Sequence, residues 1–206
     1  MTKFIVLEGP DGVGKSTVLE KLKEHLTKNN YTYLLLREPG STDVAEEVRT
    51  LTATNTMSKK TRLLLMLAAR NDLFETVIQP QIEQKTIDFI IVDRFALSSL
   101  VYNKSETFSV ETINELNQFV LGSFVPDLTV VLTADFEAIK QRRHSRGRDK
   151  DVYFDEAFAR HTLFRYSAYN KEMTPYAGDV FIDTTSLEPD TVVQKIFKEM
   201  EKLNHG

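Results

Sequence analysis

A short apolar run, a glycine-rich loop and an amphipathic helical pattern follow one another at the start of the chain, and this order constrains the fold most. Residues 4–7 are Phe-Ile-Val-Leu, a run typical of a buried parallel strand. Residues 9–16 are Gly-Pro-Asp-Gly-Val-Gly-Lys-Ser and match the G-x-x-x-x-G-K-S/T pattern of a phosphate-binding loop. Apolar residues at helical spacing then predict a helix over residues 15–28. Strand, loop and helix in this order predict an α/β fold.

The residue types in the loop suit the binding of phosphate oxygens. Glycines allow backbone N–H groups to turn inward without a Cβ clash, and the helix N-terminus adds partial positive charge. Lys15 is expected to reach the β- and γ-phosphates of a nucleotide, and the Ser16 hydroxyl to ligate Mg²⁺. The residues predicted to bind the donor nucleotide are Gly9, Pro10, Asp11, Gly12, Val13, Gly14, Lys15, Ser16 and Thr17.

The rest of the chain alternates between strand and helix patterns, without an internal repeat or an obvious linker. Further buried strands are predicted at residues 31–36, 89–92, 128–132 and 180–182. Helices are predicted at residues 43–52, 61–83, 96–102, 109–122, 155–173 and 189–203, with a bend expected at Pro80 in the second of these. This alternation predicts a single P-loop domain over residues 1–206, with a doubly wound, mainly parallel sheet of five strands and helices on both faces.

The residues at the end of the third predicted strand limit the types of reaction that the chain can catalyse. Asp93 stands where P-loop proteins place an acid that supports magnesium, so Ser16 and Asp93 are the predicted metal ligands. Many ATPases follow this acid with a Glu that activates water, whereas Arg94 follows it here. The guanine-reading motif N-K-x-D of GTPases has its nearest match at residues 103–106, which lack the Asp. These features favour phosphoryl transfer to an acceptor that is itself anionic.

Arginines follow the predicted strands at the edge where an acceptor phosphate is expected. Arg37 comes after the second strand and Arg94 after the third, and ligands of open α/β sheets bind at the carboxyl ends of the strands. A guanidinium group suits a bidentate grip on phosphate. Arg70, within the long predicted helix, is a third candidate. For each of the three, a surface arginine or a helix-cap ion pair is the alternative interpretation.

A basic run at residues 140–150 follows the fourth predicted strand and a short helix. A solvated helix face is the ordinary explanation of such a run. In a phosphate-loop protein it also has the composition of a lid, here about residues 141–153. A closing lid excludes water, and one of its arginines can stabilise charge on the transferred phosphoryl group.

Composition excludes several other classes of protein. The chain has 206 residues, enough for one domain with at most a lid or an insertion. It contains no cysteine, which removes disulfide scaffolds, thiol nucleophiles and thiolate metal sites. A formal net charge of −4 argues against binding to a nucleic-acid polymer or a membrane surface. No apolar window approaches the roughly 20 residues of a membrane span and no targeting segment is evident, so we expect a cytoplasmic protein.

Taken together, the motifs resemble those of bacterial thymidylate kinases over nearly the whole chain. Beyond the loop, the resemblance rests on residues 37–40, 63–70, 93–95, 98–99, 102, 116–117 and 126–129, and on the arginine-rich run. These segments are far more specific in combination than the loop alone. The resemblance implies transfer of the γ-phosphoryl group of ATP to dTMP with Mg²⁺, giving ADP and dTDP, usually in a homodimer.

The resemblance also implies roles for individual residues. It places Lys15, Asp11, Arg94 and Arg146 in catalysis, with Arg146 acting from the lid, and Arg142 beside the adenine of ATP. It assigns the acceptor nucleotide to Asp11, Arg37, Met66, Arg70, Arg94, Ser99 and Tyr102. Within this set, Arg94 and Arg37 would bind the phosphate, Arg70 the thymine carbonyl, and Tyr102 would pack beside the deoxyribose.

Four features depart from the pattern of the family, one of which is a short loop after Tyr102 that lacks the usual glycines. Met66 stands where Phe is common, and Phe95 where Tyr or His is usual. Residues 149–152 read Asp-Lys-Asp-Val and lack the Glu that tends to follow the lid. Two alternatives therefore stand beside dTMP phosphorylation: a kinase of other or several deoxynucleoside monophosphates, and a nucleotide-binding regulator without catalysis.

Overall fold

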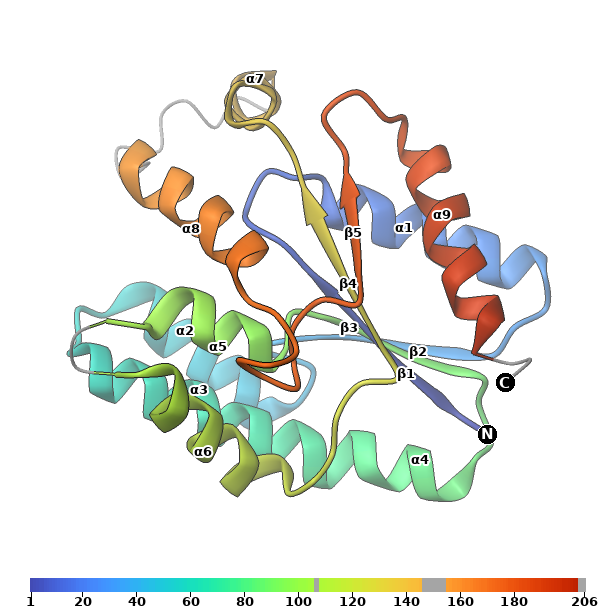
Figure 1. Ribbon diagram of the computed structural model, residues 1–206. Coiled ribbons are helices and arrows are strands. Elements are labelled where there is room, and N and C mark those ends of the chain that lie inside the picture. The colour runs from blue at the N-terminus through green and yellow to red at the C-terminus, as the bar shows by residue number, and fades with distance from the viewer. Residues whose placement is uncertain (106–107, 146–154, 204–206) are drawn as a thin grey trace.

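A five-stranded parallel sheet forms the centre of the molecule in the computed structural model, which describes residues 1–105, 108–145 and 155–203 (Figure 1). The order of the strands is β2-β3-β1-β4-β5, and every neighbouring pair is parallel. Their bounds are β1 Lys3–Glu8, β2 Tyr33–Arg37, β3 Phe89–Asp93, β4 Leu128–Thr133 and β5 Val180–Asp183. This confirms the predicted sheet.

The register of the three strands β1, β2 and β3 decides which side chains meet at the carboxyl edge of the sheet. Leu7 and Arg37 are both paired with Asp93, from opposite sides of β3. The glycine-rich loop that follows β1 therefore lies beside Asp93 and Arg94. The parallel sheet thus gathers at one edge the candidates that the sequence scatters over more than eighty residues.

Side chains of the strands alternate between two hydrophobic cores, one on each face of the sheet. Phe4 and Val6 belong to one core and Ile5 and Leu7 to the other, as the two-residue period of a strand requires. Burial on both faces explains why these strands read as continuous apolar runs.

Helices cover both faces. The described helices are α1 Lys15–Lys28, α2 Asp43–Thr54, α3 Lys59–Leu73, α4 Gln79–Gln84, α5 Ala96–Asn103, α6 Val110–Leu121, α7 Phe136–Ser145, α8 Glu156–Ala168 and α9 Pro189–Lys202. Helices α1 and α9 pack together on one face, and α3, α5 and α6 cover the other (Figure 1). No helix in the described ranges is long and apolar enough to cross a membrane.

The long helix predicted over residues 61–83 is interrupted before Pro80. A π-helical turn, Phe74–Ile78, separates α3 from α4 and precedes the proline. Proline has no N–H to donate to the carbonyl four residues earlier, and its ring crowds that carbonyl. A wider turn just before Pro80 resolves this conflict, because its hydrogen bonds span five residues.

The helix predicted over residues 155–173 ends earlier, at Ala168 in α8. The Asn170 side chain accepts hydrogen bonds from the backbone N–H groups of Glu172 and Met173, both at 3.1 Å. Such a local side-chain turn competes with the helical backbone, and a proline follows at position 175. Apolar spacing alone did not reveal this competition.

Candidate active site

The glycine-rich loop wraps closely against neighbouring elements where it leaves β1. Gly9 has a φ of 140°, and a Cβ there would collide with the carbonyl oxygen of Leu132 in β4. Gly12 has a φ of 91°, and a Cβ would lie 2.8 Å from Cγ2 of Ile139 in α7. Both positions therefore require glycine, for conformation and for space. Helix α1 begins at Lys15, so its N-terminus faces the loop.

The Lys15 side chain is buried beneath this loop. Its Nζ donates hydrogen bonds to the carbonyl oxygens of Gly9 at 2.7 Å and Pro10 at 3.1 Å. Burial, together with the positive charge of Arg94, lowers the pKa of Lys15 from 10.5 to about 8, although Asp93 and Asp11 oppose this shift. A phosphate placed against Lys15 would favour its charged form and raise this pKa again.

A polar cavity of about 330 Å³ opens over the loop. Six basic and three acidic side chains line it, together with Ser16 and two glycines: Asp11, Gly12, Gly14, Lys15, Ser16, Arg37, Glu38, Arg49, Asp93, Arg94, Arg142 and Arg143. They come from the loop, the ends of β2 and β3, and helices α1, α2 and α7. An excess of cations in a confined cavity suits a polyanion such as the phosphates of a nucleotide.

Asp93 and Ser16 can together hold a magnesium ion at the edge of this cavity. The Oδ1 atom of Asp93 is buried and has no hydrogen-bond partner among the described residues, as expected of an acceptor reserved for a ligand. Mg²⁺ is usually held by one or two protein oxygens together with phosphates and water. The described residues contain no group of three or more His, Cys, Asp or Glu that could hold a metal without such help.

Arg94 lies where the loop meets the third strand, and several contacts fix it. Its φ of 71° lies in the left-handed region, which is uncommon for a residue with a side chain. The NH2 group donates to Asp11 Oδ1 at 2.6 Å, and NH1 donates to the hydroxyls of Tyr102 at 3.0 Å and Tyr166 at 2.9 Å. Desolvation raises the pKa of Asp11, but the charges of Arg94 and Lys15 outweigh it and hold that pKa below its usual value.

A second arginine, Arg70 of α3, is buried and contacts a different set of partners. Its Nε donates to Glu38 Oε2 at 2.8 Å, and NH2 lies 2.7 Å from the same oxygen. NH1 donates to Ser99 Oγ at 2.7 Å and to Asn117 Oδ1 at 2.6 Å. Burial raises the pKa of Glu38, and the charge of Arg70 opposes the rise. These contacts use four of the five N–H donors of a guanidinium and leave one NH2 proton for a ligand.

Arg70 and Arg94 both line a second cavity, of about 620 Å³. Its lining residues are Asp11, Glu38, Pro39, Arg49, Lys59, Arg62, Met66, Arg70, Arg94, Phe95, Ser98, Ser99, Tyr102, Asn103 and Phe158. The two cavities share Asp11, Glu38, Arg49 and Arg94, so they are adjacent. Met66, Phe95 and Tyr102 add apolar surface to the second cavity. A single ligand can therefore place an anionic group at Arg94 and extend a flat, partly apolar ring toward Arg70.

Arg37 and Arg142, two further predicted residues, are also hydrogen-bonded to other residues of the chain. The NH2 group of Arg37 donates to both carboxylate oxygens of Glu46 at 2.8 Å, so Arg37 lies at the predicted edge but in a surface ion pair. Arg142 of α7 donates to the carbonyl of Val13 at 3.3 Å, to Oγ1 of Thr184 at 3.1 Å and to the carbonyls of Thr184 and Thr185. Arg146 and most of the expected lid lie outside the described residues.

Four residues at the site had no role in the sequence interpretation. Glu8, Glu38 and Asn117 are buried polar side chains that lie within the segments on which the family resemblance rests. Glu8 could have been found from the sequence, because an acid that ends an apolar strand directly before the loop needs buried hydrogen-bond partners. Tyr166 lies far along the chain in α8 and offered no local signal. Its place beside Arg94 follows only from how α8 packs against α5.

Comparison with known proteins finds relatives that match over most of the chain. A family model described as thymidylate kinase matches residues 7–196. A thymidylate kinase of Bacillus velezensis is 33% identical over 196 residues, covering 93% of this chain and 91% of its own. One of a Marinomonas species is 35% identical over 213 residues, covering 99% and 96%. One of Mycoplasma capricolum is 37% identical over 157 residues, covering 74% and 73%.

Proposed function

The chain belongs to the thymidylate kinase family, and from this premise we propose that it transfers the γ-phosphoryl group of ATP to dTMP, giving ADP and dTDP. The observation that carries the proposal is the position of Arg94. It lies where the two cavities join, 2.6 Å from Asp11 of the phosphate loop. A monophosphate bound at Arg94 would lie directly beside the donor phosphates held by the loop.

The donor occupies the first cavity in this proposal. The loop from Gly9 to Thr17 and the N-terminus of α1 surround its phosphates, and Lys15 contacts the β- and γ-phosphates. Mg²⁺, held with the help of Ser16 and Asp93, neutralises charge on the donor when bound. Arg142 lies beside the adenine at the edge formed with Thr184. The chain thus contributes positioning and charge, the two factors that phosphoryl transfer mainly needs.

The acceptor occupies the second cavity. Arg94 binds its phosphate, and Arg37 joins if it leaves Glu46. The remaining NH2 proton of Arg70 meets a carbonyl of the base, while Ser99 fixes the orientation of Arg70. Met66 packs on the face of the base, and Tyr102 lies beside the sugar. Asp11 orients Arg94 and faces the attacking end of the acceptor.

Three further parts of the proposal concern the whole chain. Residues 1–206 form one domain, in which about residues 141–153 act as a lid that closes over the donor. Arg146 then stabilises charge on the transferred group. The enzyme works in the cytoplasm on free nucleotides.

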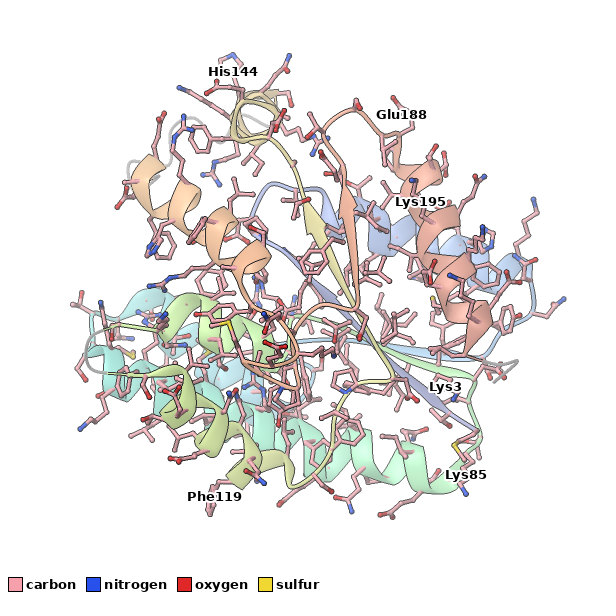
Figure 2. The ribbon with its side chains drawn as sticks, viewed as in Figure 1. Lys3, Lys85, Phe119, His144, Glu188 and Lys195 are labelled. Carbon is pink, nitrogen blue, oxygen red and sulfur yellow. The ribbon has the colours of Figure 1, made fainter. Side chains whose placement is uncertain are left out.

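We also propose a homodimer formed through the outer surface of α3 and α6, two helices that pack against each other. Phe119 of α6 is 88% exposed and projects away from the molecule in Figure 2, and Leu64 of α3 is 53% exposed. Large apolar side chains on adjacent helices suit a self-complementary contact. Sedimentation of wild type and Phe119→Asp tests this part: a dimer that the aspartate splits supports it, and a wild-type monomer at micromolar concentration contradicts it.

A coupled assay of ADP release tests the reaction itself. ATP and Mg²⁺ are supplied with thymidine, dTMP, dUMP, dCMP or dGMP as the acceptor. We expect turnover with dTMP far above that with the other acceptors. Turnover with dCMP or dGMP but not dTMP would instead support a kinase of other monophosphates, an alternative motivated by Met66. ATP binding without turnover on any acceptor would support a regulator.

A further inference from the structure

A buried carboxylate, Glu8, lies beneath Arg94 at the end of β1. It is fully buried, and Oε1 accepts hydrogen bonds from the backbone N–H groups of Phe95 at 2.8 Å and Ser98 at 3.1 Å. Oε2 accepts from the hydroxyls of Ser98 at 2.7 Å and Tyr166 at 3.0 Å. A buried charge is costly unless it is hydrogen-bonded, and four donors satisfy this one. None of them is a cation.

Tyr166 connects this carboxylate to Arg94. The Tyr166 hydroxyl has one proton, which it donates to Glu8 Oε2, and its oxygen accepts from Arg94 NH1 at 2.9 Å. Tyr166 is fully buried in α8, and its ring packs edge-on against that of Tyr102, with centroids 6.4 Å apart. The Tyr102 hydroxyl accepts the other NH1 proton. The hydrogen bonds therefore run from Arg94 through Tyr166 to Glu8.

This arrangement lets Glu8 orient Arg94 without forming an ion pair with it. Glu38 contacts Arg70 directly, and that ion pair compensates the guanidinium charge. Near Arg94, by contrast, the buried carboxylate of Glu8 is separated from the guanidinium by the neutral hydroxyl of Tyr166. The NH1 group is thus anchored to neutral acceptors, and the NH2 group, which shares the delocalised charge, is directed toward Asp11 and the cavities.

We propose that Tyr166 and Glu8 are positioning residues for the recognition of the acceptor phosphate: through the Tyr166 hydroxyl, they hold the Arg94 guanidinium in the orientation that binds this group. The inference rests on the proposed function, because it takes the ligand of Arg94 to be the phosphate of a nucleoside monophosphate. It predicts a defect that depends on the phosphate of the acceptor and not on its base.

The experiment measures the dissociation constants of thymidine and dTMP, by calorimetry or by competition, and divides the first by the second. Their ratio isolates the contribution of the phosphate. Tyr166→Phe removes only the hydroxyl and should reduce this ratio about 10-fold or more, since hydrogen bonds to charged groups are among the strong ones. The dissociation constant of ATP and the binding of thymidine should change less than about twofold.

Tyr169→Phe is the matched control. Tyr169 is also buried at the end of α8, but its hydroxyl donates to the carbonyl of Leu100 at 3.4 Å and not to the Arg94 network. We expect the ratio of the dissociation constants of thymidine and dTMP in Tyr169→Phe to match that of the wild type. A general loss of packing in this region would affect both variants, whereas loss of positioning affects Tyr166→Phe alone.

Glu8→Gln gives a second test that keeps the shape of the side chain. It should reduce the ratio in the same direction, because the amide removes the charge toward which Tyr166 donates. If both variants fold and keep the wild-type ratio, the proposal is overturned. Because binding is the readout, failure of this proposal is distinct from failure of the proposed function, which would appear as wild-type enzyme that does not phosphorylate dTMP.

Discussion

Arg70 and Arg94, which both line the second cavity, differ in the burial of the carboxylate with which each forms an ion pair. Arg70 forms an ion pair with Glu38, whose side chain is 7% exposed, so both charges are buried together. Arg94 forms its ion pair with Asp11, whose side chain is 77% exposed, and its other close partners are neutral tyrosines. The charge of Arg70 is compensated by a buried carboxylate, whereas the charge of Arg94 is paired only with a carboxylate that is screened by solvent.

This difference shows how one cavity recognises two kinds of chemistry. A neutral base needs directed hydrogen bonds and shape, which a compensated and rigid guanidinium provides. A phosphate needs positive potential together with freedom to exchange one partner for another. We therefore expect substitutions at Arg94 to affect turnover most and substitutions at Arg70 to affect folding stability most.

Arg94→Ala should show the largest effect on activity. We expect kcat/KM for dTMP to fall about 10³-fold or more, because a charged group that contacts the acceptor phosphate is lost. The free energy of unfolding should fall by less than in Arg70→Gln, since the carboxylate left behind, Asp11, is mostly exposed and the other partners are neutral hydroxyls. Steady-state kinetics and urea denaturation on the same preparation test both parts. A loss of stability above that of Arg70→Gln would contradict the comparison.

Arg70→Gln should reverse this balance. Removing the cation leaves Glu38 buried without its partner, and breaking a buried pair costs about 3–5 kcal/mol of folding free energy. We expect kcat/KM for dTMP to fall about 10- to 100-fold, mainly through KM. The double variant Glu38→Gln/Arg70→Gln, which removes both charges, is the control and should recover part of the stability. No recovery would mean that the pair is not the source of the loss.

Lys15 should produce a smaller, pH-dependent effect at the donor end. With a pKa of about 8 in the free enzyme, Lys15 is half protonated at pH 8. Binding of ATP should then take up about half a proton, detected by calorimetry in buffers of different ionisation enthalpy. Lys15→Met should abolish the uptake. In kinetics, kcat/KM for ATP should fall about tenfold per pH unit above 8.

The same pKa shift has a defined sign for stability. The folded state holds the pKa of Lys15 at about 8, while the unfolded chain keeps it at 10.5. Between these values the unfolded state binds more protons, so the contribution of Lys15 to stability rises with pH. The burial cost is full below pH 8 and absent above 10.5. The free energy of unfolding of the wild type, minus that of Lys15→Met, should therefore increase through this window, and a decrease would contradict the assignment.

Met66→Phe should give the smallest effect. A phenyl ring can stack on a base more rigidly than a thioether can, so we expect KM for dTMP to fall about two- to fivefold with kcat unchanged. The ratio of kcat/KM for dTMP to that for dUMP should change by less. An increase in KM would show that the cavity at Met66 has no room for a ring.

The sequence predicted the phosphate end of the site better than the base end. Loop spacing fixes the positions of Gly9, Gly12 and Lys15, and the strand ends fix Asp93 and Arg94, because parallel strands align their carboxyl edges. These are local patterns joined by one topological rule. The helices and strands were also predicted from local patterns, apart from the π-helical turn before Pro80 and the early end of α8.

The base end depends on contacts between residues that lie far apart in the sequence. Arg70 joins Glu38, Ser99 and Asn117, which come from three other segments. No spacing rule connects these positions. The residue pattern therefore offered Arg70 only as one of three isolated arginines, and the family resemblance alone pointed to Ser99 and to the role of Arg70 at the base. Tyr166 lies 72 residues from Arg94 and was not predicted at all. Buried polar networks are specified by tertiary packing, and single-sequence patterns do not contain that information.

The division of work between the two arginines can be measured directly as the ratio of the dissociation constants of thymidine and dTMP in three proteins. We expect a ratio of about 100 or more in the wild type, from charge-assisted contacts to the phosphate. Arg94→Ala should bring it close to one, whereas Arg70→Gln should weaken both ligands and leave the ratio within about threefold of the wild type. A ratio that survives in Arg94→Ala, or collapses in Arg70→Gln, would contradict the account.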